Sequence, residues 1–259
     1  MLESILASFN NHPEFNASVG AGLLIFARLI GFVVVAPVLG RKDVPVLIKV
    51  SFAFLMTLTF FGILSPGKPP PETSPLLSIT LNTVFGLLIG YIASLIFATI
   101  SAAGNMSNAQ MGLSSVQMFD PSSKEQSSAM GNLFAFIATI IFINIGGLYW
   151  IISALHRSFD IFPLYGTSIP LQQIINVEYL TLLSGNVLFI GLQVASPILI
   201  ATLGMDIILG IISKVAPQVN VFQLSFLFKP MIGAAIIIII LPLLINIISD
   251  YFLQYSRIY

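Results

Sequence analysis

The chain has 259 residues, of which 57% are hydrophobic and 8% charged, and its ten basic and ten acidic side chains leave no net charge. Ordinary soluble domains are about 25% charged, so these few charges cannot cover the surface of a soluble fold of this size. The net charge of zero excludes a general attraction to nucleic acid. The absence of cysteine excludes disulfides and thiol chemistry. We therefore expect an integral membrane protein whose apolar surface faces lipid or other subunits.

Six apolar stretches reach the length of about 20 residues that a bilayer-spanning helix requires. They lie at residues 17–39, 46–64, 76–103, 131–155, 179–205 and 230–249. Pro197 predicts a kink in the fifth stretch. Isoleucines fill positions 236–240 of the sixth, which still predicts helix because lipid cannot satisfy an open backbone. The sequence thus predicts an all-α, polytopic membrane protein of about six kinked helices.

The connections differ in character. Residues 40–45 form a short basic turn, and residues 65–75 contain five prolines, which predict a stiff spacer. Residues 104–130 are polar and rich in methionine, whereas residues 206–229 are only mildly polar. We expect 206–229 to be part helix and part loop.

No pattern of residues indicates catalysis. The chain contains neither His-Glu-x-x-His nor Gly-x-Ser-x-Gly. Residues 62–68 have the spacing of a phosphate-binding loop, but Pro69 replaces the Ser or Thr that would bind magnesium. We therefore predict that the protein is not an enzyme and has no cofactor and no metal site.

One charge lies inside an apolar stretch. Arg28 is in the middle of the first stretch, where a charge costs about 2.5–3.5 kcal/mol on insertion scales, so it requires a partner. Asp206, at the end of the fifth stretch, is a candidate partner; backbone carbonyls are the alternative. In the third stretch, Gly86-x-x-x-Gly90 predicts close helix packing rather than chemistry.

The segment 104–122 has two interpretations. Four of the eight methionines fall between residues 106 and 130. Methionine is unbranched and adaptable, which suits a surface that must seal and then yield, and hydrophobic constrictions close pores by excluding water. The alternative is a loop between helices that uses methionine to fill gaps. Spacing alone does not favour either.

Several blocks of residues, in order along the chain, resemble the FliR family of the bacterial flagellar export gate. They are Ala27-Arg28-Leu29-Ile30-Gly31, Ala36-Pro37-Val38-Leu39-Gly40, Pro45, Lys49, Ala103-Gly104, Gln110-Met111-Gly112-Leu113-Ser114, Asp120-Pro121, Val215-Ala216-Pro217-Gln218-Val219-Asn220-Val221-Phe222, Lys229 and Gly233. Each block alone is weak, and together they are specific. Virulence-associated type III secretion systems have a similar member, SctT.

The resemblance implies one export-gate domain over residues 1–259 of a bacterial inner-membrane protein in the flagellar basal body. Family members work with FliP and FliQ, joined by FlhB and FlhA, and pass unfolded protein substrates. Their fold combines FliP-like and FliQ-like helical hairpins around a narrow pore. The resemblance makes 104–122 a plug-like loop in that pore, with the candidate plug residues Met106, Gln110, Met111, Gly112, Leu113, Met118, Phe119, Asp120 and Pro121.

Three classes of function fit this sequence. A flagellar export-gate subunit is the main hypothesis, and a virulence type III secretion subunit is the nearest alternative. A small-molecule transporter or channel is a different class, and such proteins usually carry several ionisable residues at membrane depth. A scaffold without a pore of its own also fits, since one subunit need not enclose a channel.

Overall fold

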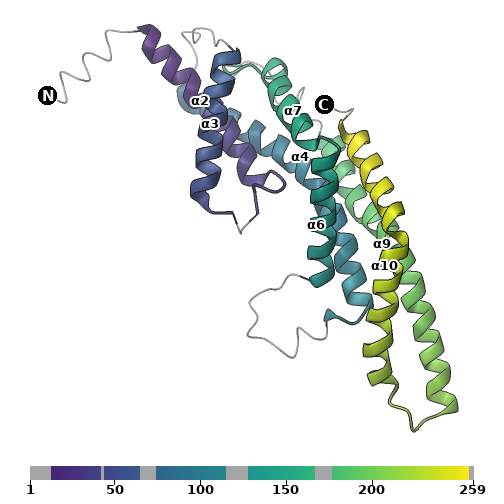
Figure 1. Ribbon diagram of the computed structural model, residues 1–259. Coiled ribbons are helices and arrows are strands. Elements are labelled where there is room, and N and C mark those ends of the chain that lie inside the picture. Colours follow the sequence, from purple (N-terminus) through teal and green to yellow (C-terminus); the bar gives the residue numbers. More distant parts are fainter. Residues whose placement is uncertain (1–12, 42–43, 65–73, 115–127, 167–176, 257–259) are drawn as a thin grey trace. The chain divides into compact units, whose positions relative to one another are not determined.

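The computed structural model describes residues 13–41, 44–64, 74–114, 128–166 and 177–256. In this part of the chain the regular elements are all α-helices (Figure 1). They are α2 Pro13–Val35, α3 Val46–Leu64, α4 Pro75–Gln110, α6 Ala129–Asn144, α7 Gly147–Ile161, α9 Val177–Val215 and α10 Val221–Ser256. The predicted all-α fold is confirmed.

The helices also have the length and apolar character of membrane spans. Within the described ranges, five helices meet both criteria, and the count rises to six if the broken pair α6 and α7 forms one span. Backbone groups inside such a helix find their partners in their own segment, which is the condition that lipid imposes. The predicted polytopic membrane protein of about six helices is therefore confirmed.

The fourth apolar stretch is two helices rather than one. α6 ends at Asn144 and α7 begins at Gly147, and Gly146 between them has a φ of +76°. The amide of Gly146 donates to the carbonyl of Ile143 at 3.1 Å. A left-handed residue after a helix closes its last turn, and glycine adopts that conformation without steric cost. Hydropathy does not reveal this break, because apolar residues continue on both sides of it.

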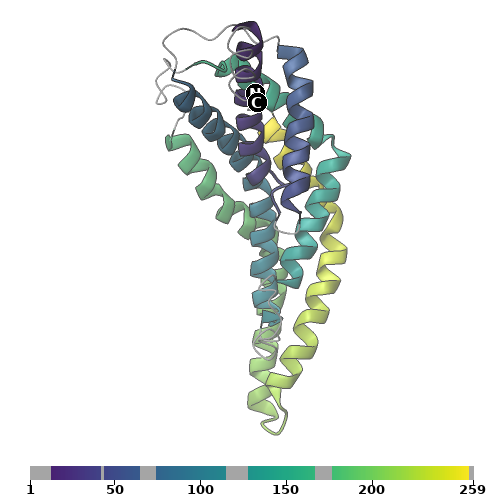
Figure 2. The same cartoon turned by 90° about the vertical axis from the view of Figure 1, so that its left-hand side faces the viewer.

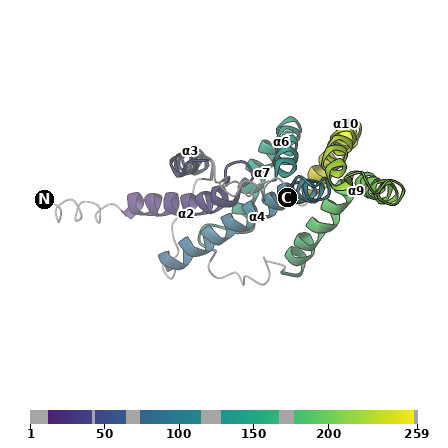
Figure 3. The ribbon, with the colours of Figure 1, turned by 90° about the horizontal axis from the view of Figure 1, so that it is seen from below.

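The mildly polar stretch 206–229 is almost entirely helical. α9 continues to Val215 and α10 begins at Val221, so only residues 216–220 connect them. The C-terminal part of α9 and the N-terminal part of α10 run side by side as a hairpin in both side views (Figures 1 and 2). α9 contains Pro197 and bends along its course, as Figure 3 shows. This bend agrees with the predicted kink.

The chain forms two compact units. The first comprises residues Met1–Ser94 and Tyr149–Val177, and the second Leu95–Leu148 and Glu178–Ile258. α4 therefore contributes to both. In the first unit α2 packs along α3, and in the second α6 packs against α10. The predicted export-gate domain over residues 1–259 was defined by function, so the division into two compact units does not test it. It stays a prediction.

Glycine allows α2 and α4 to approach closely in the first unit. A Cβ on Gly86 would collide with the carbonyl oxygen of Arg28, and one on Gly90 would lie 2.7 Å from the carbonyl oxygen of Phe32. Neither position leaves room for a side chain, because backbone rather than a flexible side chain fills the space. The predicted packing role of this glycine pair is confirmed.

The Gly86→Ala variant tests this contact. It should destabilise the protein by about 1–3 kcal/mol, because the added methyl group forces α2 and α4 apart. Gly62→Ala in α3 is the matched control, since a Cβ there meets nothing within 4 Å. The measurement is the thermal midpoint of detergent-solubilised protein for each variant. Equal midpoints for the two variants would contradict the close approach.

Candidate functional site

Arg28 is fully buried in the first unit, where it joins three parts of the chain. Its Nε and Nη2 donate to Oδ1 of Asn82 in α4 at 3.0 and 2.6 Å. Nη1 donates to the carbonyl of Ser158 at 2.8 Å and to its Oγ at 3.2 Å. Nη2 also donates to the carbonyl of Phe162 at 2.7 Å. All three guanidinium nitrogens are thus hydrogen-bonded.

The charge is stabilised by dipoles and rings instead of a carboxylate. Ser158 lies in the last turn of α7 and Phe162 follows its end, so Arg28 donates to two carbonyls at the C-terminus of this helix. This is also the negative end of the helix dipole. The centroid of the Phe159 ring lies 4.1 Å from the guanidinium carbon, which adds a cation–π contact. Asn82 is held in turn, because its Nδ2 donates to the carbonyls of Ser78 and Leu164 at 2.8 and 3.0 Å.

Of the two candidates for Arg28, the pairing with Asp206 is therefore wrong. Asp206 Oδ1 lies 2.6 Å from Nζ of Lys229 in the second unit, and Arg28 has its partners within the first. The alternative of backbone carbonyls is confirmed, with Asn82 as an additional acceptor. The sequence contained a signal for Asn82, because it is an amide inside the apolar stretch 76–103.

The first part of the predicted plug segment is the end of a helix. Residues 104–110 belong to α4, so the predicted loop boundary at 104 is corrected to 111. A Cβ on Gly104 would lie 2.6 Å from the carbonyl oxygen of Met130, which places this end of α4 directly on α6. Asn108 is buried, and its Nδ2 donates to Oγ of Ser114 at 3.0 Å. Side-chain bonds therefore hold the turn that follows α4.

Met111 is packed rather than exposed. Its side chain is completely buried, and its sulfur and terminal methyl group fill the space where a Cβ of Gly233 in α10 would lie. Gly112 follows with a φ of +76°, next to Phe226. For Met111 the structure favours the packing alternative over a pore-lining role.

The other candidate plug residues divide into two groups. Met106, Gln110, Gly112 and Leu113 are partly exposed. Met118, Phe119, Asp120 and Pro121 lie outside the described residues.

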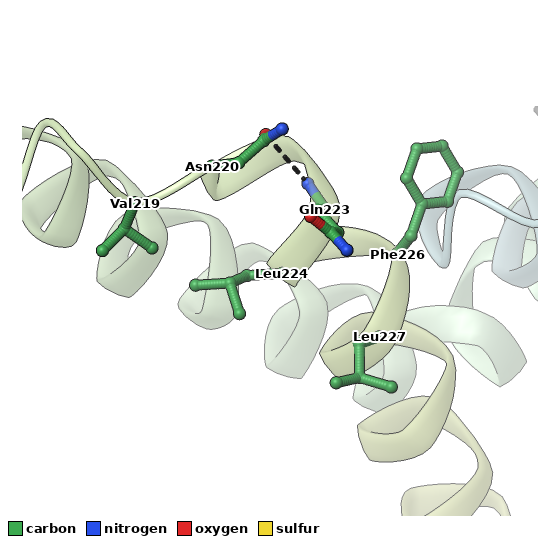
Figure 4. A pocket seen from close by; sticks show the side chains of 6 residues that line it. All are labelled: Val219, Asn220, Gln223, Leu224, Phe226 and Leu227. Carbon is green, nitrogen blue, oxygen red and sulfur yellow. Dashed lines mark hydrogen bonds between the residues drawn. The ribbon is translucent and has the colours of Figure 1, made fainter.

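The motif Val215–Phe222 forms the turn of the α9–α10 hairpin. The amide of Val219 donates to the carbonyl of Ala216 at 3.0 Å, which places Pro217 at the second position of a turn. Proline favours that position and cannot continue a helix. Asn220 precedes α10, and its Oδ1 accepts from the amide of Gln223 at 3.2 Å (Figure 4). Asparagine at the N-cap with glutamine three residues later is a helix-start signal.

A hollow of about 440 Å³ lies along the start of α10. Figure 4 shows the side chains that line it, which are Val219, Asn220, Gln223, Leu224, Phe226 and Leu227. No charged group is among them. Among the described residues, no three His, Cys, Asp or Glu side chains gather closely enough to hold a metal ion. The interactions described above are packing, helix capping, hydrogen bonds, a cation–π contact and an ion pair, and they hold helices and a turn in position.

Comparison with known proteins identifies the family. Residues 19–255 match the family model described as bacterial export proteins, family 1. The chain belongs to this family. The match includes Arg28, the end of α4 and the whole α9–α10 turn, so the features described above all lie within the family region. With its apolar helices, this family member is a multi-pass membrane protein.

Individual relatives are similar to this chain over most of their lengths. The flagellar biosynthetic protein FliR of Bacillus subtilis is 25% identical over 242 residues, which are 90% of each chain. FliR of Pectobacterium carotovorum is 29% identical over 227 residues, covering 85% of this chain and 83% of that one. The surface presentation of antigens protein SpaR of Shigella flexneri is 26% identical over 220 residues, covering 83% and 82%. The predicted family resemblance is confirmed.

Arg28→Leu tests the buried cluster. It should destabilise the protein by about 3 kcal/mol or more, because it leaves the Phe162 carbonyl and Asn82 buried without their donor. Arg28→Lys should recover only part of the loss, since a single ammonium cannot reach acceptors on three segments. The measurement is the thermal midpoint in detergent, combined with double-mutant cycles. Adding Asn82→Leu should cost less than the sum of the single changes, whereas adding Asp206→Asn should cost the full sum. Coupling with Asp206 and none with Asn82 would contradict the cluster.

Proposed function

We propose that this chain is a subunit of the flagellar type III protein export gate in the bacterial inner membrane. The observation that carries the proposal is the family match over residues 19–255, nearly the whole chain. Relatives named as flagellar biosynthetic proteins support the flagellar assignment. The similarity to SpaR supports the virulence-associated system as the second candidate.

The role proposed for the chain is structural rather than catalytic. On α3 only Ala53, Thr57 and Phe60 are buried within the chain. On the hairpin, large apolar side chains such as Ile200, Phe222 and Met231 remain exposed. Such surfaces require lipid or other apolar helices. FliP-like and FliQ-like subunits are the proposed neighbours, with FlhB-like and FlhA-like proteins completing the route for unfolded substrates.

Coexpression tests this function. Produced without its partners, the chain should accumulate poorly or aggregate, because its exposed apolar faces are unpaired. Coexpression with FliP-like and FliQ-like subunits should raise its yield, and affinity purification in mild detergent should recover all three chains together. Complementation of a strain lacking the flagellar subunit, read as motility, separates the flagellar from the virulence assignment. A long-lived monomer that binds neither subunit would exclude the proposal and favour a transporter.

We further propose that the segment after α4, together with Met106 near the end of α4, closes the pore. Its methionine content supports an adaptable apolar seal. The buried Met111 and the bonds of Asn108 support a fixed point of attachment at its start. In this proposal Met111 anchors the segment, and Met106, Met118 and Phe119 contribute to the seal.

Two sets of variants separate the seal from the anchor. Replacing Met106, Met118 and Phe119 by serine should leave the amount of assembled complex unchanged and raise ion leakage per complex, because water is no longer excluded. Met111→Ala should lower the amount of complex instead, since a buried methionine truncated to alanine costs about 2–5 kcal/mol. Both quantities are measured on one sample, as complex recovered and conductance per complex. Reduced complex without added leakage in the serine variant would contradict the seal.

A further inference from the structure

The ion pair between Asp206 and Lys229 leaves half of a carboxylate available. It joins α9 to α10 at an N–O distance of 2.6 Å through Oδ1, and Lys229 is only 15% exposed whereas Asp206 is 43% exposed. A carboxylate accepts about four hydrogen bonds. Within the described residues Lys229 is its one partner, so the second oxygen has unused capacity to accept hydrogen bonds.

On its own face of α9, Asp206 has apolar neighbours. Asp206 lies in the membrane-length part of α9, Ser184–Val215. Leu203, three residues earlier, is 57% exposed, and Gly210, four residues later, is exposed with nothing within 4 Å of where a side chain would begin. Residues at these spacings share one face of a helix. A charged oxygen on such a face is costly in lipid unless it is paired.

The shape of this face suits another helix. Small residues allow helix backbones to approach closely in membranes, and Gly210 provides such a position one turn from Asp206. A lipid acyl chain would satisfy Leu203 but not the carboxylate. A helix that is apolar and also carries one cation would satisfy both.

We propose that the face of α9 formed by Leu203, Asp206 and Gly210 is an interface for an apolar helix of a neighbouring subunit with a basic side chain level with Asp206. Asp206 then bridges two cations, Lys229 within the chain and one from the neighbour. This inference rests on the proposed function as a gate subunit.

Photo-cross-linking identifies the occupant of this face. A photoreactive amino acid replaces Leu203 in the complex purified through this chain, and replaces Ile208, 52% exposed on another side of α9, as the control. The Leu203 probe should link to a different subunit, and the Ile208 probe should link to that subunit at least roughly fivefold less, because close helix packing around a small residue is limited to one face. Links only to lipid, to this chain itself or to a second copy of it would overturn the proposal. Recovery of the partner subunits in the same purification separates that failure from failure of the proposed function.

A second experiment tests the charge. Asp206→Asn is made in the wild type and in the Lys229→Met background, and the recovered complex is quantified. If Asp206 served Lys229 alone, its loss would add nothing once Lys229 is gone. We expect a further loss of roughly tenfold in that background, as for a hydrogen bond to a charged group. Equal recovery of the Lys229→Met single variant and the double variant would overturn the bridging role.

Discussion

The buried guanidinium of Arg28 is the interaction on which the first unit depends. It brings together α2, α4 and the end of α7, which are far apart in sequence. Hydrophobic packing between these helices is not directional, whereas five hydrogen bonds from one planar group fix their relative rotation and height. Gly86 of α4 contacts the carbonyl of Arg28 itself. The same residue of α2 therefore helps to set both the distance between α2 and α4 and their register along each other.

The second unit is organised differently. Its long hairpin is defined locally, by a proline turn and an N-cap within residues 216–223. Its contacts with the end of α4 pair bulky side chains with glycines, as Met111 does with Gly233. These are interactions of shape, and they leave large apolar faces of α9 and α10 available to other molecules. A subunit built this way has a fixed frame and an outer surface suited to assembly.

The sequence predicted the helices better than it predicted their partners. Length and hydropathy found each membrane segment, because lipid demands about 20 apolar residues per span. They did not find the break at Gly146, since it changes hydropathy little, whereas the stretch 206–229 is part helix and part loop as predicted. Arg28 was found as a residue that needs a partner, and opposite charge alone made Asp206 a candidate beside backbone carbonyls. The actual acceptors, an amide and helix-terminal carbonyls, carry no formal charge, and carbonyls occur at every residue. Met111 belonged to a methionine-rich segment, and composition cannot separate a pore-lining methionine from one that fills a gap opposite a glycine.

The sequence separation within the Arg28 cluster constrains the order in which the protein is made. Ser158 follows Arg28 by 130 residues, and at about 5–20 residues per second the ribosome needs roughly ten seconds to synthesise that interval. Through this time the first helix carries a charge into the membrane region while the end of α7 does not yet exist. α2 and α3 can pair early, but the first unit closes only after the chain has passed through α4 and α6, which contribute to the second. The two units therefore mature together, and α2 is synthesised well before its partners at the end of α7 exist.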